Sequence, residues 1–100
     1  MQEVPIPELK KVVEDLHQCN ARHTGTEHVT ETFQGETVWD GDVHIFALEG
    51  HPSASVAYAW SSPVQRSLRS RFFAVLHSPP VESPQDAVRA SIATQFKNSL

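Results

Sequence analysis

VWDGDVHIFALEGHPSASVAYAWSS, residues 38–62, contains both tryptophans and the only tyrosine of this 100-residue chain. Residues 42–49 (DVHIFALE) and 54–61 (ASVAYAWS) are rich in β-branched and aromatic side chains, which favour strands. The Gly50-His51-Pro52 segment between them is typical of a loop. The stretch therefore predicts two successive strands of a β-sheet.

Both faces of the second predicted strand are apolar, because successive side chains of a strand point to opposite sides of the sheet. Val56, Tyr58 and Trp60 lie on one face, and the small Ala57 and Ala59 lie on the other. Small side chains favour a closely docked helix, so the aromatic face needs a different cover. A partner subunit, a small ligand or nothing could cover it. The alternative is that the helices cover the aromatic face and leave the small-residue face bare.

The hairpin that leads into this stretch has two interpretations. Residues 26–33 are rich in Thr and Val, and Gln34-Gly35-Glu36 is one candidate turn. In the other interpretation, Gly35 is a bulge in a long strand that runs to Trp39, and Asp40-Gly41 forms a two-residue turn. We favour the second, because Asp-Gly is the strongest short hairpin signal in the chain.

One helix is predicted before the strands in the sequence and another after them. Apolar side chains recur at helical spacing over residues 7–20. Residues 84–97 follow Ser83, a favourable N-cap. With a further apolar strand over residues 71–77, the order is α-β-β-β-β-α. We predict a single α+β domain over residues 1–100, a four-stranded antiparallel sheet with the N- and C-terminal helices packed on one face.

The composition excludes some classes of protein. A net charge of -4 and a pI near 5.8 argue against nucleic-acid binding, which uses a basic surface. The order of elements resembles that of double-stranded-RNA-binding domains, but the last helix begins SPQDAVRAS and lacks their basic cluster. The single cysteine allows no internal disulfide, and we find no pattern typical of a signal peptide or a transmembrane segment. We therefore expect a cytoplasmic protein with no membrane association.

Three stretches carry a resemblance to other proteins. ETFQGETVWDGDVHIFALEGHP (residues 31–52), AYAWS (57–61) and AVLHSPPVESPQDAVRASI (74–92) resemble small uncharacterised bacterial proteins of mobile DNA, including integron gene cassettes. Together they span about half of the chain. The resemblance implies a bacterial origin. No activity is attached to that group, so it implies no role for any residue.

The sequence gives little support for a metal site or for a nucleophilic cysteine. The histidines lack the HxxxH or HxH spacing of metal ligands, so we expect no metal and no cofactor. Cys19 falls on the apolar side of the first predicted helix, which is typical of an inert thiol. The histidines considered are His17, His23, His28, His44, His51 and His77.

Four titratable residues are candidates for acid–base catalysis. Glu31 and Glu36 are expected on apolar sides of their strands, where burial would raise the carboxyl pKa and allow general acid or base chemistry. His44 and His77 could approach each other if their strands are neighbours. The alternative is that the carboxylates reach water at a sheet edge and that the histidines are scattered.

Three arginines form the only basic cluster of the sequence. Arg66, Arg69 and Arg71 lie in and after the polar segment that joins the last two strands. A solvated loop explains them, and the alternative is a site for an anion or an acidic partner.

The aromatic side chains suggest the function. An aromatic face that no helix covers is typical of an interaction surface. We expect a binding protein that forms a homodimer, sheet to sheet or edge to edge, and takes a small apolar ligand or a protein partner. The alternatives are a small cofactor-free hydrolase or isomerase and a regulatory protein that acts on a protein partner. The predicted ligand or interface residues are Trp39, His44, Phe46, Tyr58 and Trp60.

Overall fold

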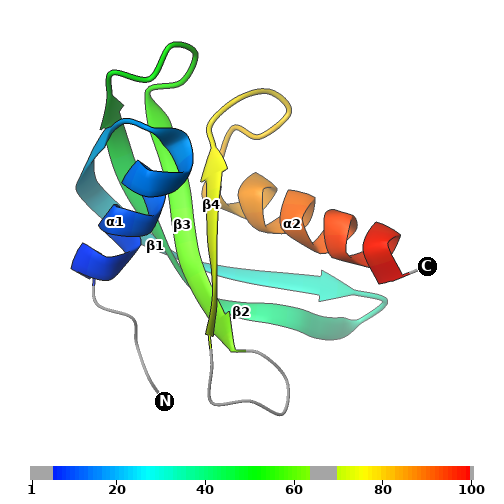
Figure 1. Cartoon of the computed structure of the whole chain (residues 1–100). Coiled ribbons are helices and arrows are strands. Elements are labelled where there is room, and N and C mark those ends of the chain that lie inside the picture. The colour runs from blue at the N-terminus through cyan, green and yellow to red at the C-terminus, as the bar shows by residue number, and fades with distance from the viewer. Residues whose placement is uncertain (1–5, 64–69, 100) are drawn as a thin grey trace.

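The computed structural model describes residues 6–63 and 70–99. Its four strands form one antiparallel sheet in the order β1-β2-β3-β4 (Figure 1). The predicted α-β-β-β-β-α order and the four-stranded antiparallel sheet are confirmed. The elements are α1 (Ile6–His17), β1 (Asn20–Phe33), β2 (Glu36–Glu49), β3 (Val56–Pro63), β4 (Ser70–Leu76) and α2 (Pro84–Ser99).

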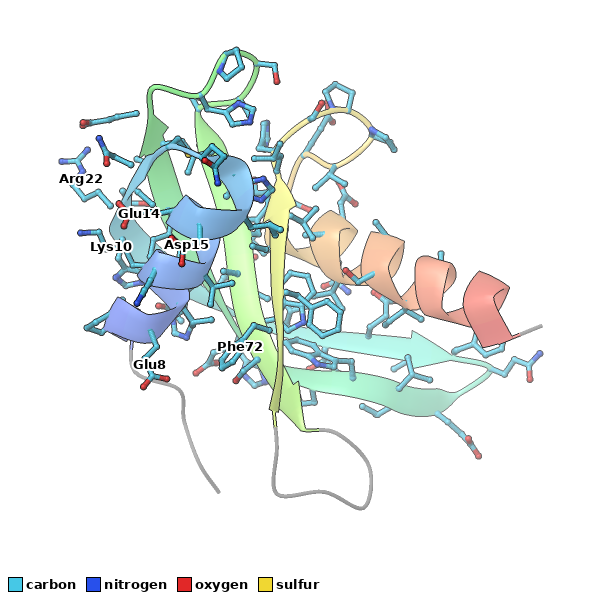
Figure 2. The ribbon with its side chains drawn as sticks, in the orientation of Figure 1. Glu8, Lys10, Glu14, Asp15, Arg22 and Phe72 are labelled. Carbon is cyan, nitrogen blue, oxygen red and sulfur yellow. The ribbon has the colours of Figure 1, made fainter. Side chains whose placement is uncertain are left out.

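The first helix is amphipathic, as its spacing predicts. Leu9 and Val13 are buried against the sheet, and Figure 2 shows Glu8, Lys10 and Asp15 on its outward side. The helix ends earlier than predicted, because Gln18 takes a left-handed conformation with φ 55°. The first strand therefore begins well before residue 26.

The β1–β2 turn lies at Gln34-Gly35, so the interpretation that we favoured is wrong. Gln34 and Gly35 have φ values of 53° and 81°, as a two-residue hairpin turn requires. The turn brings Phe33 opposite Glu36. Asp40-Gly41 lies inside β2 instead. The turn preference of a single dipeptide constrains the position of a turn less than the pairing of two long strands does. At the observed register, only a turn at Gln34-Gly35 allows β1 and β2 to pair along their whole length.

The β1–β2 hairpin is much longer than the rest of the sheet. It pairs along its whole length, whereas β2 pairs with β3 only over residues 44–47. The outer part, residues 26–43, therefore projects as a two-stranded ribbon that lies along α2 (Figure 1). A register shift between His23 and Gly25 marks its start.

The two helices lie on opposite faces of the sheet, so their predicted placement on one face is wrong. Ala57 and Ala59 pack in the core that α1 covers, and Tyr58 and Trp60 pack in the core that α2 covers. Adjacent strand residues point to opposite faces, and each face has enough apolar surface to need a helix. The buried members of the first core are Leu9, Val13, Ala21, Phe46, Leu48, Ala57 and Ala59, and those of the second are Val29, Val43, Tyr58, Trp60, Val81, Ala87 and Val88.

The start of α2 follows the sequence prediction. The Asp86 backbone N–H donates to Ser83 Oγ at 3.1 Å, and the Asp86 carboxylate accepts the Glu82 N–H at 3.2 Å. The segment before it is a turn. The Val81 N–H donates to the Ser78 carbonyl at 2.8 Å, around a cis Pro79–Pro80 peptide bond.

Candidate functional site

The five predicted site residues do not share one face. Trp39, Tyr58 and Trp60 lie on the α2 side, whereas His44 and Phe46 lie on the α1 side. Phe46, Tyr58 and Trp60 are buried, and Trp39 and His44 are half-buried. The prediction that Phe46 gathers with Trp39, Tyr58 and Trp60 is therefore wrong. It fails because the pairing of Ile45 with Tyr58 puts Phe46 opposite Ala57.

Three aromatic rings form a row across the α2 side of three strands. The ring centroids of Trp39 and Trp60 are 6.1 Å apart at 65°, and those of Trp60 and Phe73 are 5.2 Å apart and nearly parallel, at 12°. Trp60 is 2% exposed, whereas Trp39 and Phe73 are half-buried. This aromatic row is thus anchored at its centre and reaches solvent at both ends. The sequence predicts a strand over residues 71–77 but does not link Phe73 to the tryptophans.

Gly41 allows Trp39 to reach the row. A Cβ atom at residue 41 would lie 3.1 Å from Cη2 and Cζ2 of the Trp39 indole. The indole therefore lies over Gly41, in the direction in which β2 runs toward the strand segment beside Trp60. This close approach explains a glycine inside the strand, where the sequence suggested a turn.

A tyrosine–histidine pair lies on the same side of the sheet. The Tyr58 hydroxyl lies 2.6 Å from Nδ1 of His77, which follows β4. Burial, together with the negative charges of Asp86 and Glu27, raises the pKa of Tyr58. The phenol therefore stays protonated, and it holds one ring nitrogen of the half-buried His77. His44 lies on the opposite face, so the expected approach of His44 and His77 is wrong.

Glu31 binds α2 to the ribbon instead of serving as an isolated acid. Its carboxylate accepts a hydrogen bond from Gln85 Nε2 and forms an ion pair with Arg89, whose Nε lies 2.8 Å away. Burial opposes ionisation, but the hydrogen bonds from Gln85 and Arg89 and the charge of Arg89 outweigh it and lower the pKa of Glu31. The expected rise of this pKa is wrong. Glu36, the other candidate acid, is exposed beside the hairpin turn.

Removing the Arg89 side chain should weaken the attachment of α2. We expect Arg89→Ala to lower the free energy of unfolding by about 0.5–1 kcal/mol near neutral pH, because Arg89 is largely exposed and its charge is screened. Because the fold lowers the Glu31 pKa, the ionised carboxylate stabilises the folded state at pH values above the ordinary pKa of a glutamate. This stabilisation is lost as the pH falls through the pKa of the folded state. The difference between variant and wild type should therefore shrink in urea titrations at about pH 3.

Arg22→Ala is the matched control, since Arg22 is an exposed arginine near the start of β1, far along the strand from Glu31, and Figure 2 shows it at the edge of the molecule away from α2. An equal loss of stability in both variants would show that the Arg89–Glu31 contact has no specific effect.

A second charged group lies on the outer face of the ribbon. Nε2 of His28 lies 2.7 Å from the Asp40 carboxylate, and its Nδ1 lies 3.0 Å from that of Asp42. Both nitrogens can donate only in the protonated imidazole, so this is the geometry of a charged histidine. Hydrogen bonds to Asp42 and then to Asp40 raise the pKa of His28. The Asp40 pKa is lowered in turn, by the Thr30 hydroxyl and by His28.

The His28 group should make the ribbon sensitive to pH. A raised histidine pKa adds stability below the ordinary value of about 6.5, and this stability disappears as pH rises through the folded value. An NMR titration of the His28 ring should give a pKa above 6.5, with Asp42→Asn and Asp40→Asn each bringing it down. Asp15→Asn on α1 is the control and should leave it unchanged. A His28 pKa that is insensitive to both ribbon substitutions would contradict this geometry.

The other predicted features add no site. Arg66 and Arg69 lie outside the described residues, as does the Arg71 side chain. Cys19 is half-buried and packs against the α1 core. Within residues 6–63 and 70–99, no group of three or more His, Cys, Asp or Glu side chains is arranged to hold a metal ion. None of the described helices has the length and apolarity needed to cross a membrane.

Comparisons of the chain with protein-family models, with curated proteins and with solved structures find no match.

Proposed function

We propose that this protein is a small cytoplasmic binding protein that acts as a homodimer and receives an apolar small molecule or protein segment at the aromatic row. The observation that carries the proposal is the row itself. Three rings in contact, with half-buried Trp39 and Phe73 at its ends, offer apolar area together with an indole N–H donor. The cytoplasmic setting fits the lone free cysteine.

Exposed apolar side chains support self-association. Leu16 is 60% exposed and Phe72 is 40% exposed, on the same side of the sheet (Figure 2 places Phe72 below α1). Phe33 and Val38, near the tip of the ribbon, are also largely exposed. Such surface is costly in water for a domain of this size, and a second copy would cover part of it.

Fluorescence tests the binding proposal. Anilinonaphthalene sulfonate serves as an apolar aromatic probe, and its binding should quench tryptophan emission. We expect Trp39→Ala to weaken probe binding about tenfold, since it removes one end of the row, and Phe72→Ala to leave it unchanged. Equal affinity for wild type and the Trp39→Ala variant would place the probe elsewhere and remove the row from the proposal. Light scattering over a hundredfold dilution tests the dimer.

A second candidate function is a small hydrolase or isomerase that uses His77. The contact of its Nδ1 with the buried Tyr58 hydroxyl favours this candidate, because a positioned imidazole is the commonest general acid or base. We expect His77→Asn to abolish such an activity and Tyr58→Phe to reduce it, with a shifted pH–rate profile. If no turnover of ester, amide or enolisable ketone substrates exceeds that of the His77→Asn variant, this candidate is eliminated.

A further inference from the structure

We propose that His23 and His44 form a binding site for a divalent transition-metal ion, of the zinc, copper and nickel group, on the α1 side of the β1–β2 hairpin. The two histidines come from neighbouring strands, and the Thr26 hydroxyl contacts both rings. Imidazole nitrogen is a ligand that suits these ions, whereas Mg²⁺ and Ca²⁺ take oxygen ligands. The site is independent of the function proposed above, because the aromatic row lies on the α2 side.

The ring nitrogens of the two histidines converge on one position. Thr26 Oγ1 lies 3.0 Å from His23 Nε2 and 2.8 Å from His44 Nδ1. A metal ion binds an imidazole nitrogen from the direction in which that nitrogen makes a hydrogen bond. Zinc–nitrogen bonds measure about 2.0–2.1 Å, so each nitrogen would approach an ion at this position by less than about 1 Å. The ring centroids are 5.6 Å apart and the planes are inclined at 61°, so the rings are not stacked and both can face one ion.

A β-bulge in β1 places the two histidines on the same face of the sheet. The strand pairing shifts between His23 and Gly25, which leaves Thr24 as the extra residue. His23 and Thr26 are three positions apart, so in a regular strand their side chains would point to opposite faces. With the bulge, both side chains lie on the face of His44. Bulges often re-aim a side chain beside a functional site, and this one directs His23 toward His44.

The bulge also explains why the sequence shows no metal-ligand spacing here. The HxH and HxxxH patterns describe ligands on one regular strand or helix. His23 and His44 lie on two strands, and one of these strands is irregular. Their approach therefore follows from the register of the hairpin, as the aromatic row does.

The surrounding contacts hold the two rings in place. The centroid of the His23 ring lies 5.5 Å from that of fully buried Phe46. Thr24, the extra residue of the bulge, donates its hydroxyl to the Ile45 carbonyl at 3.3 Å. Both histidine rings are half-buried, and their contacts with the Thr26 hydroxyl lie at the surface. An ion from solvent can therefore reach a site whose ligands are already held close to one another.

The Thr26 hydroxyl is a partner that an ion can displace. Thr26 is exposed, and rotation about a single side-chain bond moves its hydroxyl away. Other histidines have partners that are harder to displace. His17 contacts a backbone carbonyl, each ring nitrogen of His28 faces a carboxylate, and His51 accepts two backbone N–H groups. This difference favours the pair at Thr26 as the metal site.

Two histidines leave part of the coordination sphere of the ion open. Zinc in proteins is usually four-coordinate, and sites with fewer protein ligands hold water or a small molecule in the remaining positions. We therefore expect an ion that exchanges with solvent, in contrast to the closed site of a structural zinc.

A zinc titration followed by NMR tests the site. The protein carries Cys19→Ser, so that the free thiol does not compete for the metal. The titration is run at about pH 7.5, because protons compete with metal ions for imidazole nitrogen. We expect Zn²⁺ to shift the ring signals of His23 and His44 together, with a dissociation constant below about 1 mM, and Mg²⁺ to leave them unchanged. Ring signals that do not respond to Zn²⁺ would overturn the proposal.

Substitution of the histidines locates the ion. His23→Ala and His44→Ala should each weaken Zn²⁺ binding by at least about tenfold, since each removes one of the two protein ligands. His28→Gln is the matched control, because His28 is an exposed histidine on the same hairpin, and it should change the affinity by less than about twofold. An equal loss of affinity in the His28→Gln variant would place the ion at the carboxylates of Asp40 and Asp42 and overturn the proposal.

Thr26→Val tests the position of the ion while both histidines remain. Valine keeps the branched shape that suits a strand, but it has no hydroxyl to contact the ring nitrogens. We expect the Zn²⁺ affinity to rise about threefold, because the ion no longer competes with hydrogen bonds to the hydroxyl. An unchanged or lower affinity, in a variant that circular dichroism shows to be folded, would contradict an ion at this position.

Discussion

Trp60→Ala should lower the free energy of unfolding by about 3–5 kcal/mol, the usual cost of removing a buried tryptophan. Trp60 is 2% exposed and is the only ring in contact with both Trp39 and Phe73 among the described residues. The substitution leaves a large cavity under α2 and separates the two ends of the row. Urea unfolding followed by circular dichroism measures the effect without depending on tryptophan emission.

Phe72→Ala is the control for this experiment. It removes an aromatic ring from the strand next to Trp60, but Phe72 is 40% exposed and lies on the other side of the sheet. We expect a loss below about 1 kcal/mol. Similar losses for Trp60→Ala and Phe72→Ala would show that the α2 side is not a packed core.

Phe46→Ala should cost a similar amount, about 3–5 kcal/mol, on the opposite face. Phe46 is fully buried in the core that α1 covers, with the His23 ring 5.5 Å away. Because the two cores are separate, local effects should differ. Hydrogen exchange should accelerate mainly in α1 for Phe46→Ala and mainly in α2 for Trp60→Ala.

Leu16→Ala is the matched control on α1, since Leu16 is 60% exposed and its truncation should change stability by less than about 0.5 kcal/mol. If Phe46→Ala instead accelerated exchange in α2, the assignment of the helices to separate faces would be wrong.

Local signals predicted the elements well. Propensity and periodicity act over a few residues, and three features of that kind were correct. They are the apolar spacing of α1, the Ser83 cap of α2 and the alternation of β3. The sequence also showed that both faces of β3 need a cover. The sequence could not show which helix covers which face, because the face that α2 reaches depends on the path of the chain through residues 77–83.

The candidate site was harder to predict because it depends on register. Placing the turn at Asp40-Gly41 would have put Gly41 at the tip of the hairpin. With the turn at Gln34-Gly35, Gly41 lies under the Trp39 indole and Glu31 faces α2. A shift of register changes which side chains share a face, so the aromatic row, the Glu31 contact and the His28 group all follow from one turn.

Nuclear Overhauser effects from the methyl groups of Ala87 and Val88 test whether α2 covers the aromatic face of the sheet. We expect cross-peaks from these methyls to ring protons of Tyr58 or Trp60, and none to the Phe46 ring. Cross-peaks to the Phe46 ring, or methyls with no aromatic neighbour, would show that α2 does not cover this face.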